Sequence, residues 1–322
     1  MAKIYKPKIN ILDTNKKISE EFLDCLRRRN ISTKFQYWGK KETQNWLNVC
    51  KEPEYINWPL EIELLNTNLP EIIKLVDKNV KNLISLGIGN GEKDKMILSA
   101  FLKNRPMRYF TIDISLHMVK AGFKALSKIP VEKTAYIGDF EHLETLAPKI
   151  KKRTDSHNLI SILGNTLGNL DQINTLNLIR RSMDKNDYLL FAVQILRRGK
   201  ILDIGEIFNA YNTKALQELS FGAIIRCGLK RTDGIIEIEF GKNKLYSQLD
   251  TIEYFFTFKK DRTIKYLNHE INFKINERIL TYYSYKYDEK NITFLLTNNG
   301  FKIVRYFFTP GHKYLLALVK LK

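Results

Sequence analysis

The sequence predicts an α/β protein built on a doubly wound parallel sheet. Short apolar segments alternate with helical patterns, beginning with a helix near 60–76, and strands are predicted at 83–87, 109–113, 134–138, 159–164 and 188–194. From Ile235 onward the apolar period changes to two, which is typical of antiparallel strands. Because parallel strands separated by helices point the same way, ligands are expected at their carboxyl ends.

These patterns divide the chain of 322 residues into four predicted parts. Residues 1–60 are expected to be an N-terminal helical segment, with a helix at 19–26 that begins at Ser19. Residues 61–195 form the predicted core, and residues 196–286 form an inserted α+β lobe. Residues 287–322 are expected to complete a seven-stranded core sheet. Period-two strands are predicted at 235–240, 252–258, 271–275, 301–307 and 314–319.

A glycine-rich turn follows the first predicted strand. Gly87, Gly89 and Gly91 fall at alternate positions and lead into a helical pattern. Glycines at such a turn allow a ligand to lie directly on the backbone. The next strand ends in Asp113, and a carboxylate at that place can accept hydrogen bonds from both hydroxyls of a ribose. The pair predicts an adenosine-type cofactor.

The spacing of these residues favours one cofactor. Dinucleotide-binding proteins usually carry G-x-G-x-x-G, but position 92 of this chain is Glu. S-adenosylmethionine-dependent methyltransferases typically have glycines at alternate positions, then a second strand that ends in an acidic residue, then a segment like Gly138-Asp139-Phe140. In that interpretation Asp139 accepts from the adenine amino group and Phe140 lies against the ring.

Two further segments carry a more specific resemblance. Residues 164–169 read GNTLGN, and residues 279–287 read ILTYYSYKY. With 86–93 and 138–140, they resemble the histidine-specific, ergothioneine-type Nα-methyltransferases, a family that includes fungal dimethylallyltryptophan N-methyltransferases. The aromatic segments 34–37 and 53–55 are similar to N-terminal segments of the same family. The resemblance therefore extends over nearly the whole chain.

The resemblance implies a Rossmann-like class I methyltransferase fold and two sets of site residues. In it, residues 1–60 close the substrate site and the inserted lobe binds substrate. The implied cofactor residues are Gly87, Gly89, Lys93, Asp113, Asp139 and Phe140. The implied substrate residues are Tyr37, Tyr55, Asn169, Tyr282 and Ser284, with Asn169 and Tyr37 as the catalytic candidates that orient the reacting amine. Methyl transfer from a sulfonium requires alignment and the loss of one proton rather than a covalent nucleophile.

Two positions depart from the family pattern. Tyr282 stands where the histidine enzymes carry a Glu that bonds the imidazole, and Ile201 aligns with a Tyr that helps to hold the carboxylate. A site that must bond polar groups rejects a mismatched partner strongly. The predicted activity is therefore S-adenosylmethionine-dependent N-methylation of a primary amine on a small amino-acid-like or amine metabolite other than histidine. Histidine Nα-methylation is the first alternative.

Composition describes an ordinary globular chain, with 44% hydrophobic and 27% charged residues. No apolar run is long enough to span a membrane, and a cytoplasmic monomer or weak dimer is expected. Three cysteines, Cys25, Cys50 and Cys227, lack metal-type spacing, so no metal is predicted.

The net charge of +18 keeps a nucleic-acid methyltransferase open as the second alternative. Adenine N6 enzymes usually place a Pro-Pro-aromatic turn after the fourth strand, and this chain has Leu163-Gly164-Asn165-Thr166 there. The longest basic run, 149–153, is expected in a solvated surface loop. A small-molecule partner is preferred to nucleic acid. A non-catalytic methyltransferase-like subunit is disfavoured because Gly87, Asp113 and Asp139 are all present.

Overall fold

The computed structural model describes residues 5–196, 201–242 and 249–322. The chain forms two compact units, each built from discontinuous segments. Unit 1 contains residues 1–12, 56–199 and 287–322, and unit 2 contains residues 13–55 and 200–286. No helix in the described ranges has both the length and the apolar character needed to cross a membrane.

Unit 1 is organised around an eight-stranded sheet in the order β1-β4-β3-β2-β5-β6-β13-β12. The strands from β1 to β6 run parallel, and β13 pairs with β6 and β12 in antiparallel fashion. This order confirms the doubly wound class I methyltransferase fold. The strands are β1 Lys8–Ile11, β2 Val80–Leu86, β3 Arg108–Asp113, β4 Lys133–Ile137, β5 His157–Ile162, β6 Tyr188–Gln194, β12 Phe301–Phe308 and β13 Tyr314–Leu321.

The eighth strand was not expected, because residues 1–60 were predicted to be helices and loops. Strand β1 pairs in parallel with β4, with Lys8 opposite Thr134 and Ile11 opposite Ile137. All four of its residues are exposed, including Ile9 and Ile11. The segment Lys8–Ile11 alternates polar and apolar residues, but an alternation of only four residues that buries no side chain is too short to indicate a strand.

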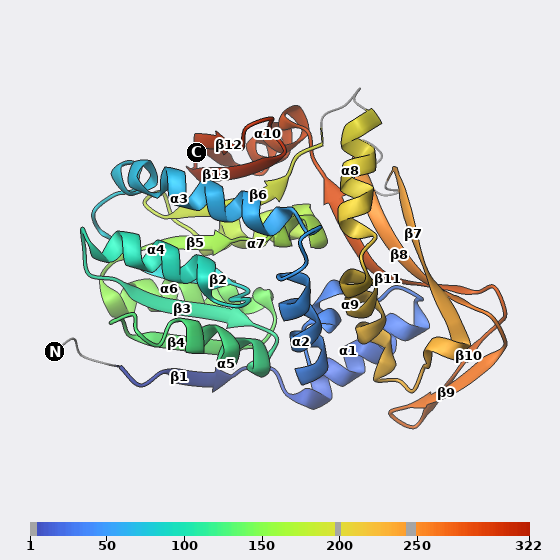
Figure 1. Ribbon diagram of the computed structural model, residues 1–322. Coiled ribbons are helices and arrows are strands. Elements are labelled where there is room, and N and C mark those ends of the chain that lie inside the picture. The colour runs from blue at the N-terminus through green and yellow to red at the C-terminus, as the bar shows by residue number, and fades with distance from the viewer. Residues whose placement is uncertain (1–4, 197–200, 243–248) are drawn as a thin grey trace. The chain divides into compact units, whose positions relative to one another are not determined.

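Helices cover both faces of this sheet. Figure 1 shows α3, α4 and α5 on the face of the sheet toward the viewer. Here α3 contacts α4, and α6 contacts α7. The helices of unit 1 are α3 Asn57–Leu75, α4 Glu92–Leu102, α5 Leu116–Ala125, α6 Leu143–Thr154, α7 Gln172–Ser182 and α10 Glu289–Asn298, with the 3-10 helices η2 Phe140–His142 and η3 Thr166–Asn169.

The basic run 149–153 lies in α6 and not in a loop, so that prediction was wrong. Pro148 argues against a helix because it removes one backbone hydrogen bond. The helix nevertheless continues, since Leu143, Ala147 and Ile150 repeat at helical spacing and are all buried. Apolar packing thus outweighs the cost of the proline. The positive charges occupy the last turns, where they interact favourably with the negative end of the helix dipole.

Unit 2 combines helices with a three-stranded antiparallel sheet in the order β11-β8-β7. Helix α9 contacts α2 and also β11. Helix α1 begins at the cap Thr14, whose side chain accepts from the backbone N of Lys17, and not at Ser19. The elements of unit 2 are α1 Asn15–Arg27, η1 Thr33–Gln36, α2 Lys40–Val49, α8 Ile201–Tyr211, α9 Lys214–Ile225, η4 Arg231–Asp233, β7 Gly234–Lys242, β8 Asp250–Phe258, β9 Arg262–Tyr266, β10 His269–Phe273 and β11 Arg278–Lys286.

Candidate functional site

The glycine turn joins β2 to α4 with left-handed backbone at three positions. Gly87, Gly89 and Gly91 have φ angles of 82°, 55° and 80°. A Cβ at Gly91 would lie 2.6 Å from the carbonyl oxygen of Gly122 on α5. Gly91 is therefore required both by its backbone conformation and by the close packing behind the loop.

Asp113 ends β3 and binds the glycine turn directly. Its Oδ2 accepts from the backbone N of Ile88 at 3.1 Å, and its Oδ1 accepts from the backbone N of Ser115 at 2.8 Å. Burial raises the pKa of Asp113 to about 7, against the lowering effect of these two bonds. Each carboxylate oxygen has a second lone pair, which suits a ribose hydroxyl.

Asp139 and Phe140 follow β4 at the same edge of the sheet. The backbone N of Gly138 donates to the carbonyl oxygen of Asp113 at 3.0 Å, which ties the two strand ends together. The Asp139 side chain caps η2 by accepting from the backbone N of Glu141. The Phe140 ring would lie 3.6 Å from a Cβ at Gly87. Unit 1 thus brings together the predicted cofactor residues Gly87, Asp113, Asp139 and Phe140.

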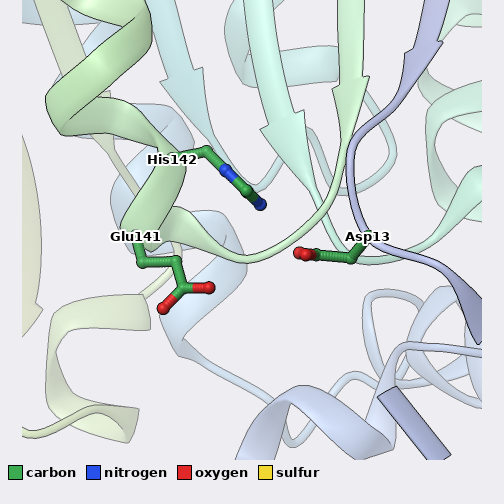
Figure 2. A group of neighbouring side chains, drawn as sticks. All are labelled: Asp13, Glu141 and His142. Carbon is green, nitrogen blue, oxygen red and sulfur yellow. The ribbon is translucent and has the colours of Figure 1, made fainter. Parts of the chain in front are cut away.

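Carboxylate and imidazole side chains lie near this edge and again beside the turn before β6. Figure 2 shows the side chains of Glu141 and His142, which come from η2, and it also draws Asp13, a residue of unit 2. Elsewhere in unit 1, His157, Asp184 and Asp187 place ligand atoms within 4.8 Å of one another. Asp187 already accepts from the backbone N of Asn158 and of Asp184, so it stabilises the turn before β6.

Lys93, predicted to bind the cofactor, forms an ion pair with a glutamate that sequence reasoning missed. Its Nζ lies 2.6 Å from Oε2 of Glu61 on α3, whose side chain is fully buried. Both oxygens of Glu61 also accept from the backbone N of Gly164, at 2.9 and 3.0 Å. The only signal in the sequence is an acidic residue on the apolar face of the helix at 60–76, next to Leu64 and Leu65.

Asn169 ends η3, the short helix that follows β5. Its side chain is buried, with 7% exposure. The turn before it is sharp, because Gly164 and Asn165 both have positive φ angles, of 76° and 59°. The Oδ1 of Asn165 accepts from the backbone N of Gln194 at 3.0 Å, which anchors the turn to β6. Asn169 therefore stands on a rigid part of unit 1.

The other predicted substrate residues lie together in unit 2. Aromatic rings run in edge contact from Tyr37 to Trp46, Tyr55 and Tyr211, with centroids 5.6, 6.1 and 6.4 Å apart. Tyr282 contacts Tyr254 at 5.3 Å. Burial and then the neighbouring hydroxyls of Tyr211, Tyr37, Tyr55 and Tyr254 raise the pKa of Tyr282 well above its ordinary value. We call Tyr37, Tyr55, Tyr211, Tyr254 and Tyr282 the tyrosine cluster.

Ser284 and Lys286 lie beside this cluster, on the same face of β11 as Tyr282. The Lys286 Nζ donates to Ser284 Oγ at 2.8 Å and lies 3.9 Å above the ring of Tyr211. The Tyr211 hydroxyl is 3.2 Å from Ser284 Oγ. Burial lowers the pKa of Lys286 well below its ordinary value. Sequence reasoning missed Tyr211, Tyr254 and Lys286. The side chain of Ile201 lies outside the described residues.

Comparison with known protein families agrees with the arrangement of these site residues. Residues 18–321 match the family described as histidine-specific, S-adenosylmethionine-dependent methyltransferases. The chain belongs to this family. It is therefore an S-adenosylmethionine-dependent methyltransferase, as predicted, and its glycine-rich turn and buried Asp113 fit the glycine-loop and ribose contacts that this cofactor requires.

Named relatives are similar at low identity. A histidine N-alpha-methyltransferase of Mycolicibacterium smegmatis is 24% identical over 281 residues, which is 84% of each chain. One of Mycobacterium tuberculosis is 25% identical over 201 residues, covering 58% of this chain and 59% of the relative. A methyltransferase structure from Clostridium acetobutylicum aligns with a TM-score of 0.43 at 10% identity, over 80% of this chain and 90% of that one. The fold is identified from the strand order of unit 1 and not from this structural alignment.

The raised pKa of Asp113 predicts a pH-dependent cofactor affinity. Ribose hydroxyls donate to the ionised carboxylate, so below about pH 7 binding must first displace a proton. We expect affinity for S-adenosylhomocysteine to fall about tenfold from pH 8 to pH 6. Asp113→Ala should weaken binding by at least about 1 kcal/mol, and Asp113→Asn should flatten the profile.

Calorimetric titration at several pH values measures both effects. Without ligand, Asp113 makes the free energy of unfolding change with pH in the direction opposite to that of an ordinary salt-bridged Asp. The folded state holds a proton that the unfolded state has lost between pH 3.8 and about 7, so this group's contribution to stability decreases as pH rises through that window. An unchanged binding profile in Asp113→Asn would contradict the assignment.

Proposed function

We propose that this methyltransferase transfers one to three methyl groups from S-adenosylmethionine to a primary amine of a small amino-acid-like metabolite. The observation that carries the proposal is the tyrosine cluster, in which Tyr282 is buried and four other tyrosines help to raise its pKa. Rigid aromatic rings with hydroxyl tips suit a flat or cationic small molecule, through stacking and cation–π contact. Family membership supports the amine as the group that is methylated.

Each proposed residue then has a role in binding or orientation. Bound S-adenosylmethionine supplies an electrophilic methyl group on sulfur. Asn169 and Tyr37 orient the attacking nitrogen, and Tyr55, Tyr282 and Ser284 shape the remainder of the acceptor site. The pKa values of Tyr254 and Tyr282 are raised by burial, so both hydroxyls stay protonated near neutral pH. They act as hydrogen-bonding groups rather than bases, and the amine must release its proton before attack.

Histidine is the second candidate acceptor, favoured by the names of the relatives. Tyr282 argues against it, because a tyrosine hydroxyl is a weaker partner for imidazolium than the glutamate that the resemblance places there. The neighbouring groups Ser284 and Lys286 supply no carboxylate in exchange. A different amine, aromatic or cationic, fits this lining better.

Tyr282→Glu provides the test of the acceptor. We expect the variant to methylate histidine about tenfold faster than the wild type, since a carboxylate restores a charge-assisted hydrogen bond worth about 1.5–3 kcal/mol. Mass spectrometry of products from a pool of amino acids, aromatic amines, guanidino amines and short RNA measures the outcome.

Tyr283→Glu is the matched control, because Tyr283 lies on the opposite face of β11 and pairs with Tyr285. It should leave histidine turnover unchanged. Methylated histidine as the dominant wild-type product would overturn the interpretation of Tyr282. Methylated RNA would overturn the small-molecule assignment.

A further inference from the structure

Glu61 connects three separate segments of unit 1 through one buried carboxylate. It accepts from Lys93 Nζ on α4, from the backbone N of Gly164 after β5, and from the Tyr314 hydroxyl on β13 at 3.1 Å. The Glu61 side chain has no exposure, and the Lys93 side chain is 11% exposed. A buried carboxylate with this many donors is held in one position.

The same contacts fix Lys93. Its ammonium lies 4.8 Å from the ring centroid of Trp58, one turn before Glu61 on α3. Removing one member of a buried pair leaves the other charge uncompensated, which is far more costly than losing a surface pair. The position of the Lys93 ammonium therefore depends on Glu61.

Glu61 and Lys93 lie at the point where the strand order of the sheet reverses. In the order β3-β2-β5, the chain proceeds from β2 to one side and reaches β5 on the other, and ligands bind at such a switch point. Asp113, the predicted ribose residue, ends β3 and binds the turn after β2. Lys93 and Gly164 follow β2 and β5 and so lie on the other side of β2 from Asp113. With the ribose on Asp113, the amino-acid end of the cofactor is expected to extend toward Lys93 and Gly164.

We infer that Glu61 is a positioning residue for the amino-acid end of S-adenosylmethionine. It holds the Lys93 ammonium and the backbone turn at Gly164 in the arrangement that receives the charged methionine portion. A buried ammonium already paired with a carboxylate presents a fixed dipole rather than a free cation, which suits a ligand end carrying both an ammonium and a carboxylate.

Two ligands separate this role from a merely structural one. S-adenosylhomocysteine has the amino-acid end, and 5′-methylthioadenosine lacks it while retaining the adenosine and sulfur. Calorimetry on Glu61→Gln should show about tenfold weaker binding of the first, or about 1.4 kcal/mol, and a change of less than about twofold for the second. Lys93→Met should show the same selective loss, and the double variant should lose less than the product of the two single losses.

Glu63→Gln is the matched control, because it makes the same chemical change at an exposed position of the same helix. It should leave both affinities unchanged. Equal weakening of both ligands by Glu61→Gln would show a role in folding alone and overturn the inference, as would unchanged binding of both. If Glu61→Gln fails to fold, Glu61→Asp, which keeps the charge but withdraws the carboxylate from Lys93, is compared with the same two ligands.

Discussion

Replacing Asn169 with alanine is expected to lower kcat/KM for the acceptor amine by about 100- to 1000-fold, the range seen when a preorganised hydrogen-bonding group is lost. The amide stands at the end of η3, buried and anchored through Asn165 to β6. A group held this rigidly aligns its ligand without further ordering, so its loss affects the reaction more than the fold. Affinity for S-adenosylhomocysteine should change by less than about twofold.

The rate is measured by mass spectrometry with the amine that the pool assay identifies, and cofactor binding is measured by calorimetry. Asn174→Ala is the matched control, since Asn174 is exposed on α7, five residues further along the chain. It should retain full activity. A variant at position 169 that loses cofactor affinity in proportion to rate would contradict the acceptor assignment.

Gly91→Ala is expected to lower the free energy of unfolding by about 3 kcal/mol or more, through backbone strain and overpacking together. Its φ of 80° is a left-handed conformation, and the new Cβ would lie 2.6 Å from the oxygen and 2.9 Å from the Cα of Gly122. These are backbone atoms, so no rotation of a side chain relieves the clash.

Urea denaturation followed by circular dichroism measures the loss of stability. Gly205→Ala is the control, because Gly205 is exposed within α8 and a Cβ there would meet nothing within 4 Å. Alanine in a helix interior should stabilise the protein by about 0.5–1 kcal/mol. Equal stability of the two variants would show that the loop and α5 separate easily.

The sequence predicts an element correctly where burial requires a regular pattern of apolar residues. Strands β2 to β6 are buried along almost every residue, so they read as apolar runs bounded by turns. Strand β1 could not be found in this way, because its polar–apolar alternation covers only four residues and none of them is buried. Strand β9, with only Ile264 buried in its interior, was missed for the same reason.

The site shows a similar division. The predicted members Tyr37, Tyr55 and Tyr282 came from local motifs, each legible within a few residues. Tyr211 and Tyr254 were missed because the hydroxyl of Tyr254 bonds the carbonyl oxygen of Tyr211, and no local pattern reveals a partner 43 residues away. Glu61 was missed because its partners lie 32, 103 and 253 residues distant.

The position of β13 has a consequence for how the chain folds. Strand β13 inserts between β6 and β12, and Tyr314 pairs with Gln194, which lies 120 residues earlier (314 − 194). While the protein is being synthesised, β6 therefore emerges long before its neighbour β13 and presents an open edge of unpaired backbone N–H and C=O groups in a largely apolar strand. Residues 200–286, which belong to the other unit, must be made in the interval. Pairing over such separations is slow, so the half-finished sheet is the stage most exposed to aggregation and most dependent on chaperones.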